Sequence, residues 1–285
     1  MKLKKTIPTL SINCNGDLVD LTTPKVMGII NVTPDSFYDG GKFKDEKSIL
    51  KQAEKILVDG ADFIDIGAYS SKPGANFVSE NEELKRITPI VKLIIKSFPN
   101  CKISIDSFRS KVINECVELG ASISNDISAG KLDPMMMETV GKLNIPYIMM
   151  HMRGTPKTMQ NKTNYKNIVN QVFEYFSERI TTAQQHNIND IIIDVGFGFA
   201  KTIEQNYVLL KKLNYFNSHN YPILTGISRK SMIYNLLDCN ASEALNGTTA
   251  LNMTALINGS KILRVHDVKE AVECVCLFNA LEKES

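Results

Sequence analysis

Short apolar runs recur eight times along this chain of 285 residues, and a segment with helical spacing follows each of them. The runs lie near residues 26–31, 62–66, 102–106, 121–125, 145–150, 190–195, 221–226 and 261–265. After the second run, Leu84, Ile87, Val91 and Ile94 recur at the intervals of an amphipathic helix. Eight strand–helix units in about 260 residues favour an α/β fold of the (β/α)8 type, a TIM barrel. A doubly wound parallel sheet is the alternative.

The sequence indicates a single domain over residues 1–285, because no stretch resembles a linker or a low-complexity tract. Residues 1–25 precede the first strand–helix unit and alternate weakly around Asn15-Gly16, a pair typical of tight hairpin turns. We therefore expect an N-terminal β-hairpin that plugs or flanks the barrel.

Composition narrows the class of protein. Apolar residues make up 43% and charged residues 22%, which is ordinary for a soluble globular chain, and a net charge of +2 argues against a nucleic-acid partner. No apolar run reaches signal-peptide or membrane-spanning length, so no membrane partner is expected. The six cysteines form no Cys-x-x-Cys pair and indicate reduced thiols in a cytoplasmic protein.

The first run is followed by an unusually polar connection. The strand ends at Asn31, and the next ten residues include Asp35, Phe37 and the pair Gly40-Gly41. A buried strand that leads into a glycine-rich polar loop is how many α/β enzymes build a site, although a plain turn can use the same residues.

Polar residues stand at the end of every predicted strand. In chain order they are Asn31, Asp65, Asp106, Asn125-Asp126, Met150-His151, Asp194, Ser228-Arg229-Lys230, and Arg264 with His266. Any one of them could be a helix cap, but in a barrel all of them face one cavity at the carboxyl rim. The set therefore predicts a binding site there.

The residue types suggest two ligand chemistries. Asp106, Asn125 and Asp194 suit a ligand rich in N–H donors. Asn31, Arg264 and His266 suit an anion or a magnesium-bound phosphate, and the helix expected after His266 adds a favourable dipole. Lys230 begins another helix and could contact either ligand.

Three other features have simpler interpretations. The run Met135-Met136-Met137 predicts helix packing rather than a metal site. His186 and His219 are expected at the surface, and Ser79 to Glu82 form a helix-capping pattern.

The ordered motifs resemble those of the dihydropteroate synthase family over residues 25–280. They are Gly28-Ile-Ile-Asn-Val-Thr-Pro-Asp-Ser-Phe37, Asp65-Ile-Gly, Ser71-Lys-Pro-Gly-Ala75, Ile103-Ser-Ile-Asp106, Asn125-Asp-Ile-Ser-Ala-Gly130, Met150-His-Met152, Gly154-Thr-Pro-Lys-Thr-Met-Gln160, Asp194-Val-Gly-Phe-Gly-Phe199, Gly226-Ile-Ser-Arg-Lys-Ser231 and Arg264-Val-His-Asp-Val268. The resemblance implies an enzyme of folate biosynthesis that joins 6-hydroxymethyl-7,8-dihydropterin diphosphate to p-aminobenzoate. It also implies assistance by Mg²⁺, competition by sulfonamides and a homodimer.

Residue roles carried over from the family divide the rim into three parts. The pterin would contact Asp106, Asn125, Asp194, Lys230, Arg264, Met150 and Phe199. The diphosphate would contact Asn31, Arg264, His266 and Lys230, with Asn31 as the protein's Mg²⁺ ligand. The p-aminobenzoate and the two loops around it would involve Asp35, Phe37, Ser71, Lys72, Pro73 and Ser228.

The chain departs from the family pattern at three places. Ser71-Lys72 replaces a common Thr-Arg, so the charge stays but the planar fork of arginine is lost. Val195 replaces a common proline, and Ala68-Tyr69-Ser70 replaces a common Gly-Glu-Ser.

Two other functions remain possible from the sequence. One is a pterin-binding methyltransferase barrel, which would lack Ser228-Arg229-Lys230. The other is a non-catalytic pterin-binding paralogue, against which the complete set of rim residues argues. For the enzyme, a dissociative, SN1-like substitution is the expected mechanism, because the dihydropterin can delocalise positive charge once diphosphate leaves.

Overall fold

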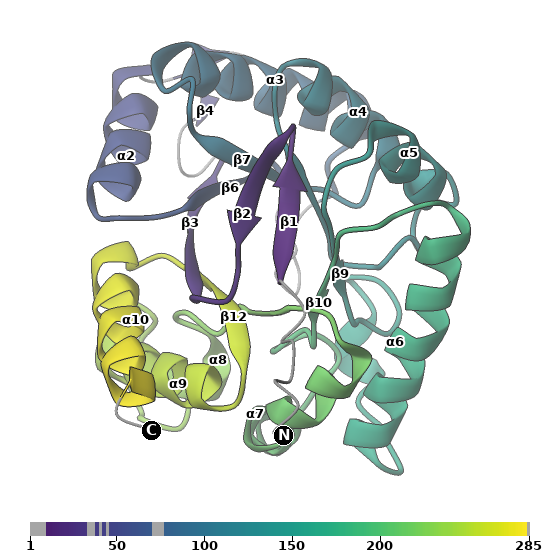
Figure 1. The fold of residues 1–285 in the computed structure, drawn as a ribbon, viewed down its shortest axis with the longest axis vertical. Helices are drawn as coiled ribbons and strands as arrows, with labels where there is room; N and C mark the ends of the chain where they lie inside the picture. Colours follow the sequence, from purple (N-terminus) through teal and green to yellow (C-terminus); the bar gives the residue numbers. More distant parts are fainter. Residues whose placement is uncertain (1–9, 33–37, 40–41, 44–45, 70–76, 284–285) are drawn as a thin grey trace, which may run out of the picture.

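A closed barrel of eight parallel strands forms the centre of the molecule (Figure 1). A computed structural model of the chain describes residues 10–32, 38–39, 42–43, 46–69 and 77–283. The barrel strands are β3 (Lys25–Asn31), β6 (Phe63–Gly67), β7 (Lys102–Asp106), β8 (Ile123–Asp126), β9 (Tyr147–Met150), β10 (Ile191–Asp194), β11 (Ile223–Thr225) and β12 (Ser260–Val265). The last strand, β12, pairs with the first, β3, with Arg264 opposite Met27. The predicted (β/α)8 barrel is therefore confirmed, and the doubly wound sheet is excluded.

Helices alternate with these strands and surround the barrel (Figure 1). They are α2 (Glu46–Val58), α3 (Glu80–Ser97), α4 (Ser110–Glu118), α5 (Met136–Leu143), α6 (Ile168–Gln185), α7 (Ile203–Lys211), α8 (Ser231–Tyr234), α9 (Leu245–Ile257) and α10 (Val268–Lys283), with short 3₁₀ turns η1 (Met159–Asn161) and η2 (Leu213–His219). On α3 the predicted apolar face is buried, and Ser79 caps the helix by accepting from the Glu82 amide at 3.3 Å. The apolar faces of the helices and the outward side chains of the strands form one continuous core.

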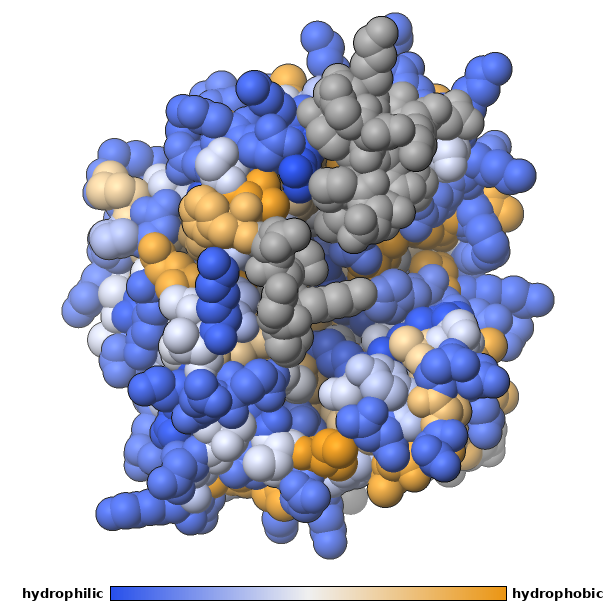
Figure 2. All heavy atoms as spheres, turned by 180° about the vertical axis from the view of Figure 1, so that it is seen from behind, coloured by the Kyte–Doolittle hydropathy of each residue, from blue (hydrophilic) through white to orange (hydrophobic). Residues whose placement is uncertain are grey.

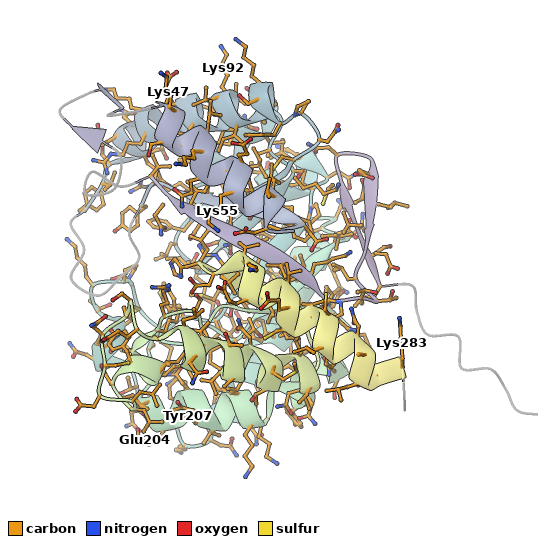
Figure 3. The ribbon with its side chains drawn as sticks, turned by 90° about the vertical axis from the view of Figure 1, so that its left-hand side faces the viewer. Lys47, Lys55, Lys92, Glu204, Tyr207 and Lys283 are labelled. Carbon is orange, nitrogen blue, oxygen red and sulfur yellow. The ribbon has the colours of Figure 1, made fainter. Side chains whose placement is uncertain are left out.

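The predicted N-terminal hairpin is present and closes one end of the barrel. Strands β1 (Ser11–Cys14) and β2 (Asp17–Asp20) pair antiparallel around Asn15-Gly16, both of which have positive φ as the turn requires. Ile12 and Leu21 are buried against the inward side chains of the barrel strands. Figure 3 shows the hairpin at the end of the barrel towards which α10 runs with Lys283.

The barrel interior has an apolar half and a polar half. Next to the hairpin, it is filled by Met27, Phe63, Ile123, Ile148, Ile192, Leu224 and Ile262. Alternate residues of a strand point to the same face, so the next inward positions on four of these strands are Asp65, Asn125, Asp194 and Arg264. The apolar layer thus forms a sealed floor, and the polar layer above it opens to the opposite end.

Close packing of α2 and α10 on β3 explains one glycine of the first motif. A Cβ on Gly28 would lie 2.5 Å from Ile56 Cγ2 and 2.9 Å from Val268 Cγ2, so only glycine fits between the strand and these helices.

Two other expectations concern loops and the surface. In the polar, glycine-rich connection after β3, β4 (Tyr38–Asp39) and β5 (Lys42–Phe43) pair antiparallel, while residues 33–37, 40–41 and 44–45 lie outside the described residues. His219, expected at the surface, is half-buried, and its ring stacks on Phe173 with centroids 3.9 Å apart. Among the helices of the described ranges, none has the length and apolar character to cross a membrane.

Candidate active site at the carboxyl end of the barrel

Polar side chains from β6, β7, β8, β10 and β12 gather at the end of the barrel opposite the hairpin. Figure 2 shows this face, which is largely hydrophilic and has a depression near its middle. The parallel strands deliver these side chains together because their carboxyl ends meet at one rim.

Arg264 joins two carboxylates at the centre of the rim. Its Nε donates to Asp65 Oδ2 at 2.6 Å, and its Nη2 donates to Asp106 Oδ2 at 2.7 Å. Asn125 Nδ2 lies 3.2 Å from both oxygens of Asp65. Asp65 is fully buried, so these two donors compensate for the loss of water around its charge.

The electrostatic balance of this cluster makes one carboxyl easy to protonate. Burial raises the pKa of Asp106 to about 7, with Arg264 opposing the shift and Asp65 adding to it. Burial disfavours the charge of Arg264, but Asp65 and Asp106 outweigh that effect, and the pKa of Arg264 is raised above its usual value. The guanidinium is therefore a permanent cation, whereas Asp106 can accept or donate a proton near neutral pH.

Asp194 and Lys230 form the other side of the rim. Asp194 is buried, and its Oδ1 accepts from the Gly196 amide at 2.8 Å. Burial raises the pKa of Asp194, and Lys230 opposes that shift. Lys230 Nζ donates to the Phe197 carbonyl at 2.6 Å and lies 5.0 Å from the centroid of Phe199. Burial lowers the pKa of Lys230 to about 8.

Ser228 and His266 bring together the loops after β11 and β12. The Ser228 Oγ lies 3.0 Å from His266 Nδ1 and accepts from the His266 amide at 3.2 Å. Arg229, between Ser228 and Lys230, donates to both oxygens of Asp267, from Nε at 2.8 Å and from Nη2 at 2.7 Å. This two-point ion pair holds the loops after β11 and β12 in a fixed position relative to each other.

Three of the remaining predicted residues, Asn31, Met150 and Phe199, lie at or just beyond the carboxyl ends of their strands. Met150 is buried, and Phe199 packs against the apolar cluster that contains it. Asn31 is exposed at the end of β3. Asp35, Phe37, Ser71, Lys72 and Pro73 lie outside the described residues.

Asp65 is the central residue that sequence reasoning gave no role. It appeared among the polar strand ends and in one motif without a role of its own, yet it holds both Arg264 and Asn125. The available signal was the strand period, because Asp65 lies two residues after Phe63 and shares its inward face.

Among the described residues, no group of three or more His, Cys, Asp or Glu side chains could hold a metal ion. The exposed carboxamide of Asn31 offers an oxygen donor at the rim. That donor set suits Mg²⁺, which commonly takes one or two protein oxygens and completes its shell with water and substrate phosphates.

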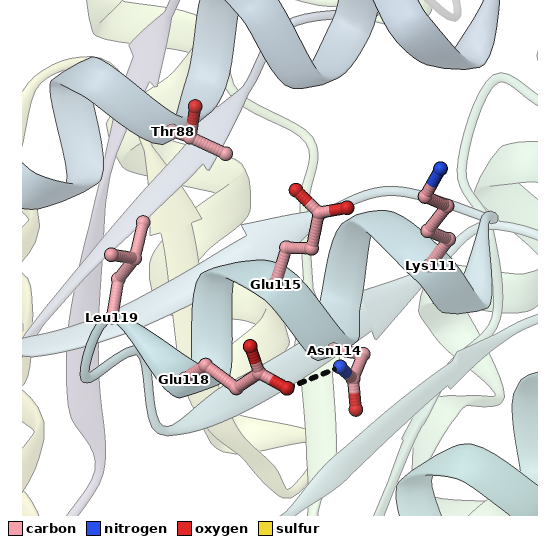
Figure 4. Close-up of a pocket in the computed structure, with 6 residues that line it drawn as sticks. All are labelled: Thr88, Lys111, Asn114, Glu115, Glu118 and Leu119. Carbon is pink, nitrogen blue, oxygen red and sulfur yellow. Dashed lines mark hydrogen bonds between the residues drawn. The ribbon is translucent and has the colours of Figure 1, made fainter.

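A groove of about 580 Å³ lies elsewhere, on the outside of the barrel between α3 and α4 (Figure 4). Its lining residues are Thr88, Lys111, Asn114, Glu115, Glu118 and Leu119. Asn114 Nδ2 donates to Glu118 Oε1 at 2.7 Å, so these polar groups satisfy one another. The groove contains none of the rim residues and takes no part in the site.

Comparison with known proteins gives concordant results. Residues 27–266 match the family described as pterin binding enzyme. The chain is 41% identical to the dihydropteroate synthase of Haemophilus influenzae over 273 residues, which cover 95% of this chain and 98% of that protein. The dihydropteroate synthase of Escherichia coli K12 is also 41% identical, over 95% of this chain and 96% of its own length.

Solved structures of dihydropteroate synthases superpose closely on this chain. A Yersinia pestis dihydropteroate synthase in a sulfonamide drug complex superposes with a TM-score of 0.90 at 38% identity, covering 96% of this chain and all of that one. A Xanthomonas albilineans dihydropteroate synthase with 4-aminobenzoic acid has a TM-score of 0.89 at 33% identity, covering 96% of this chain and 98% of that one.

Proposed function

The chain belongs to the dihydropteroate synthase family of pterin-binding enzymes, and from this premise we propose a role for each group at the barrel mouth. The enzyme forms 7,8-dihydropteroate and diphosphate from 6-hydroxymethyl-7,8-dihydropterin diphosphate and p-aminobenzoate. The observation that carries the assignment of roles is the convergence of Asp106, Asn125, Asp194, Lys230 and Arg264 above the sealed apolar floor.

The deep polar layer is the proposed pterin site. The amino-pyrimidinone edge of a pterin presents N–H donors beside ring acceptors, which match the carboxylates of Asp106 and Asp194 and the amide of Asn125. Lys230 can donate to the ring, and Arg264 has its planar group fixed for stacking by Asp65 and Asp106. Met150 and Phe199 supply an apolar wall beside these groups.

The outer rim is the proposed place of the diphosphate. Arg264 lies near the end of β12, His266 directly follows that strand, and α10 begins at Val268, so its amino end adds a favourable dipole for an anion. Asn31 would hold Mg²⁺, with the diphosphate supplying further oxygen ligands. When bound, Mg²⁺ supplies charge neutralisation for the leaving diphosphate.

For p-aminobenzoate we propose the loop side of the mouth. Ser228 lies at the rim with its hydroxyl oriented by His266, where it can donate to a carboxylate. The family resemblance adds Asp35, Phe37, Ser71, Lys72 and Pro73 from the two loops.

The proposed reaction is a dissociative substitution. The described residues form no Ser–His–Asp arrangement at the pterin layer, and the chemistry requires no protein nucleophile, because the dihydropterin cation is stabilised by its own ring. The protein's part is to orient the ring, hold the leaving anion and exclude water around the cation until the amine attacks. Positional isotope exchange within the diphosphate, measured without p-aminobenzoate, tests this proposal. An absence of exchange, together with rates that follow amine nucleophilicity, would indicate direct displacement.

A single assay tests the overall assignment. Purified protein with both substrates and Mg²⁺ should release dihydropteroate and diphosphate in equal amounts, and Asp194→Asn should lose most of that activity. Pterin binding without product would instead indicate the non-catalytic paralogue.

We propose further that the enzyme is a cytoplasmic homodimer. The helices α9 and α10 lie side by side (Figure 1) and leave Ile257 64% and Leu277 62% exposed, a feature that a second copy of the chain would cover. The six cysteines are free thiols, as in a reducing compartment. Light scattering after size-exclusion chromatography should give twice the chain mass, and Ile257→Glu with Leu277→Glu should halve it; a monomeric wild type would contradict the dimer.

A further inference from the structure

Lys201 is a buried lysine that the reaction outlined above does not use. It follows the Gly-Phe-Gly-Phe motif, precedes α7, and is only 4% exposed. Its Nζ donates to the carbonyls of Phe199 at 2.8 Å, Gly196 at 2.9 Å and His151 at 3.4 Å, and lies 3.0 Å from His151 Nδ1. Four acceptors thus surround one amino group.

This arrangement favours a charged lysine. An ammonium group offers three N–H donors, whereas carbonyl oxygens can only accept. Burial lowers the pKa of Lys201, and the carboxylate of Asp194 opposes that shift. Burial also holds the pKa of His151 well below its usual value, so the imidazole is neutral and its Nδ1 accepts from Lys201 while Nε2 carries the proton.

The acceptors of Lys201 belong to two different loops of the proposed pterin site. His151 directly follows Met150 at the end of β9, whereas Gly196 and Phe199 lie in the loop that follows Asp194. The two loops touch closely, since a Cβ on Gly196 would lie 2.2 Å from the His151 carbonyl oxygen. Lys201 therefore connects the loops at their point of contact.

Groups that face the pterin depend on the same loop. The Gly196 amide donates to Asp194, and the Phe197 carbonyl accepts from Lys230. The ring of Phe199 lies beneath the Lys230 ammonium group. A shift of residues 196–199 would consequently displace a carboxylate, a cation and an aromatic ring together.

We propose that Lys201 is a positioning residue for the pterin half of the active site, where its buried ammonium group fixes the loops after β9 and β10 and favours the ionised form of Asp194. The proposal rests on the assignment of Asp194 and Lys230 to the pterin. The charged groups facing Asp194 are Lys230, Arg264 and Lys201, and all three favour its ionised form. Arg153 is the further cation near Lys201 itself.

Two substitutions separate the geometric role of Lys201 from its electrostatic role. Lys201→Gln removes the charge but keeps N–H donors, whereas Lys201→Arg keeps the charge but changes the shape of the donor group. Lys211→Gln is the matched control, because Lys211 is exposed at the end of α7. For each variant, the dissociation constant of the dihydropterin diphosphate should be measured from pH 5 to 9, together with the Michaelis constant for p-aminobenzoate.

We expect both Lys201 variants to weaken pterin binding by roughly tenfold to a hundredfold, with p-aminobenzoate changed by less than about threefold. In Lys201→Gln alone, the pKa of Asp194 should rise further, so binding should be lost at a higher pH as the solution is acidified. Lys211→Gln should match the wild type.

Several results would overturn the proposal. Equal loss of affinity for both substrates would mean that Lys201 only supports the fold, and an unchanged pterin profile would mean that it positions nothing. If Lys201→Gln does not fold, His151→Gln, which leaves Lys201 in place, should still weaken pterin binding severalfold; an unchanged affinity there would refute the link. Failure of the wild type itself to bind the pterin would refute the site assignment instead.

Discussion

Replacing Asp65 with asparagine should damage the site without changing its shape. Asp65 accepts from Arg264 at 2.6 Å and from Asn125 at 3.2 Å while fully buried. An asparagine has one acceptor oxygen, so it can satisfy only one of these donors and turns its own N–H groups towards the other. Removing one partner of a buried ion pair costs about 3 kcal/mol, and we expect a loss of that order in the free energy of unfolding.

The same change should weaken pterin binding. Arg264 would then be held by Asp106 alone. A displacement of its guanidinium that costs about 2 kcal/mol of binding free energy raises the dissociation constant of the dihydropterin diphosphate about 30-fold. Calorimetric titration with the dihydropterin diphosphate measures this. Asp62→Asn is the control, since Asp62 accepts from the Val26 amide at 2.9 Å at the opposite end of β6, and it should lower stability without changing pterin affinity.

The pH dependence gives a second readout. In the wild type the pKa of Asp106 is raised from 3.8 to about 7, so the folded state binds more protons than the unfolded state. The stabilisation from this group is complete below pH 3.8 and is lost as the pH rises through about 7. Asp65→Asn removes a negative charge that raises the pKa of Asp106, so this pKa should be lower in the variant. The loss of stability with rising pH should therefore be complete at a lower pH than in the wild type. Urea unfolding from pH 4 to 8 tests this, and a variant with wild-type slope and wild-type affinity would refute the reasoning.

Three further changes test other parts of the mouth. The pKa of Lys230 is lowered to about 8, so kcat/KM for the dihydropterin diphosphate should fall as the pH rises through that value, and Lys230→Arg should remove the fall even if its overall rate is lower. Gly196→Ala places a Cβ 2.2 Å from the His151 carbonyl oxygen and should reduce pterin affinity at least tenfold. In the comparison variant Gly198→Ala, the Cβ would meet only the Lys230 side chain at 3.5 Å. That variant should lose about 1–2 kcal/mol of stability because of the positive φ at this position. Lys72→Arg should lower the Michaelis constant for p-aminobenzoate and strengthen sulfonamide inhibition, because it restores a planar fork, and unchanged values would contradict a role for that fork.

The strands of the barrel were predictable because each is a short run of apolar residues in the sequence that ends at a polar residue. Lys102–Asp106 and Ser260–Val265, for example, fall within two residues of the predicted runs. The rim residues were predictable for the same reason, since a buried strand that stops at Asp194 or Asn125 marks the boundary between core and cavity.

Partnerships between distant strands were not predictable. Asp65 and Arg264 are 199 residues apart, and nothing near either residue indicates that closure of the barrel makes them an ion pair. No role was predicted for Lys201, because its acceptors are mainly backbone carbonyls of loops whose path the sequence does not specify. The partial burial of His219 was not predicted, because its stacking on Phe173 depends on how η2 packs against α6.

The pairing of β12 with β3 also determines when the protein can first work during its synthesis. Residues 25–31 leave the ribosome early, but their strand partner on one side is made only at residues 260–265. Until then, Asp65 and Asp106 have no guanidinium between them, and both flanks of the incomplete sheet expose backbone groups that other chains could pair with. The nascent chain can therefore acquire neither its pterin site nor a protected sheet before residues 260–265 have been made.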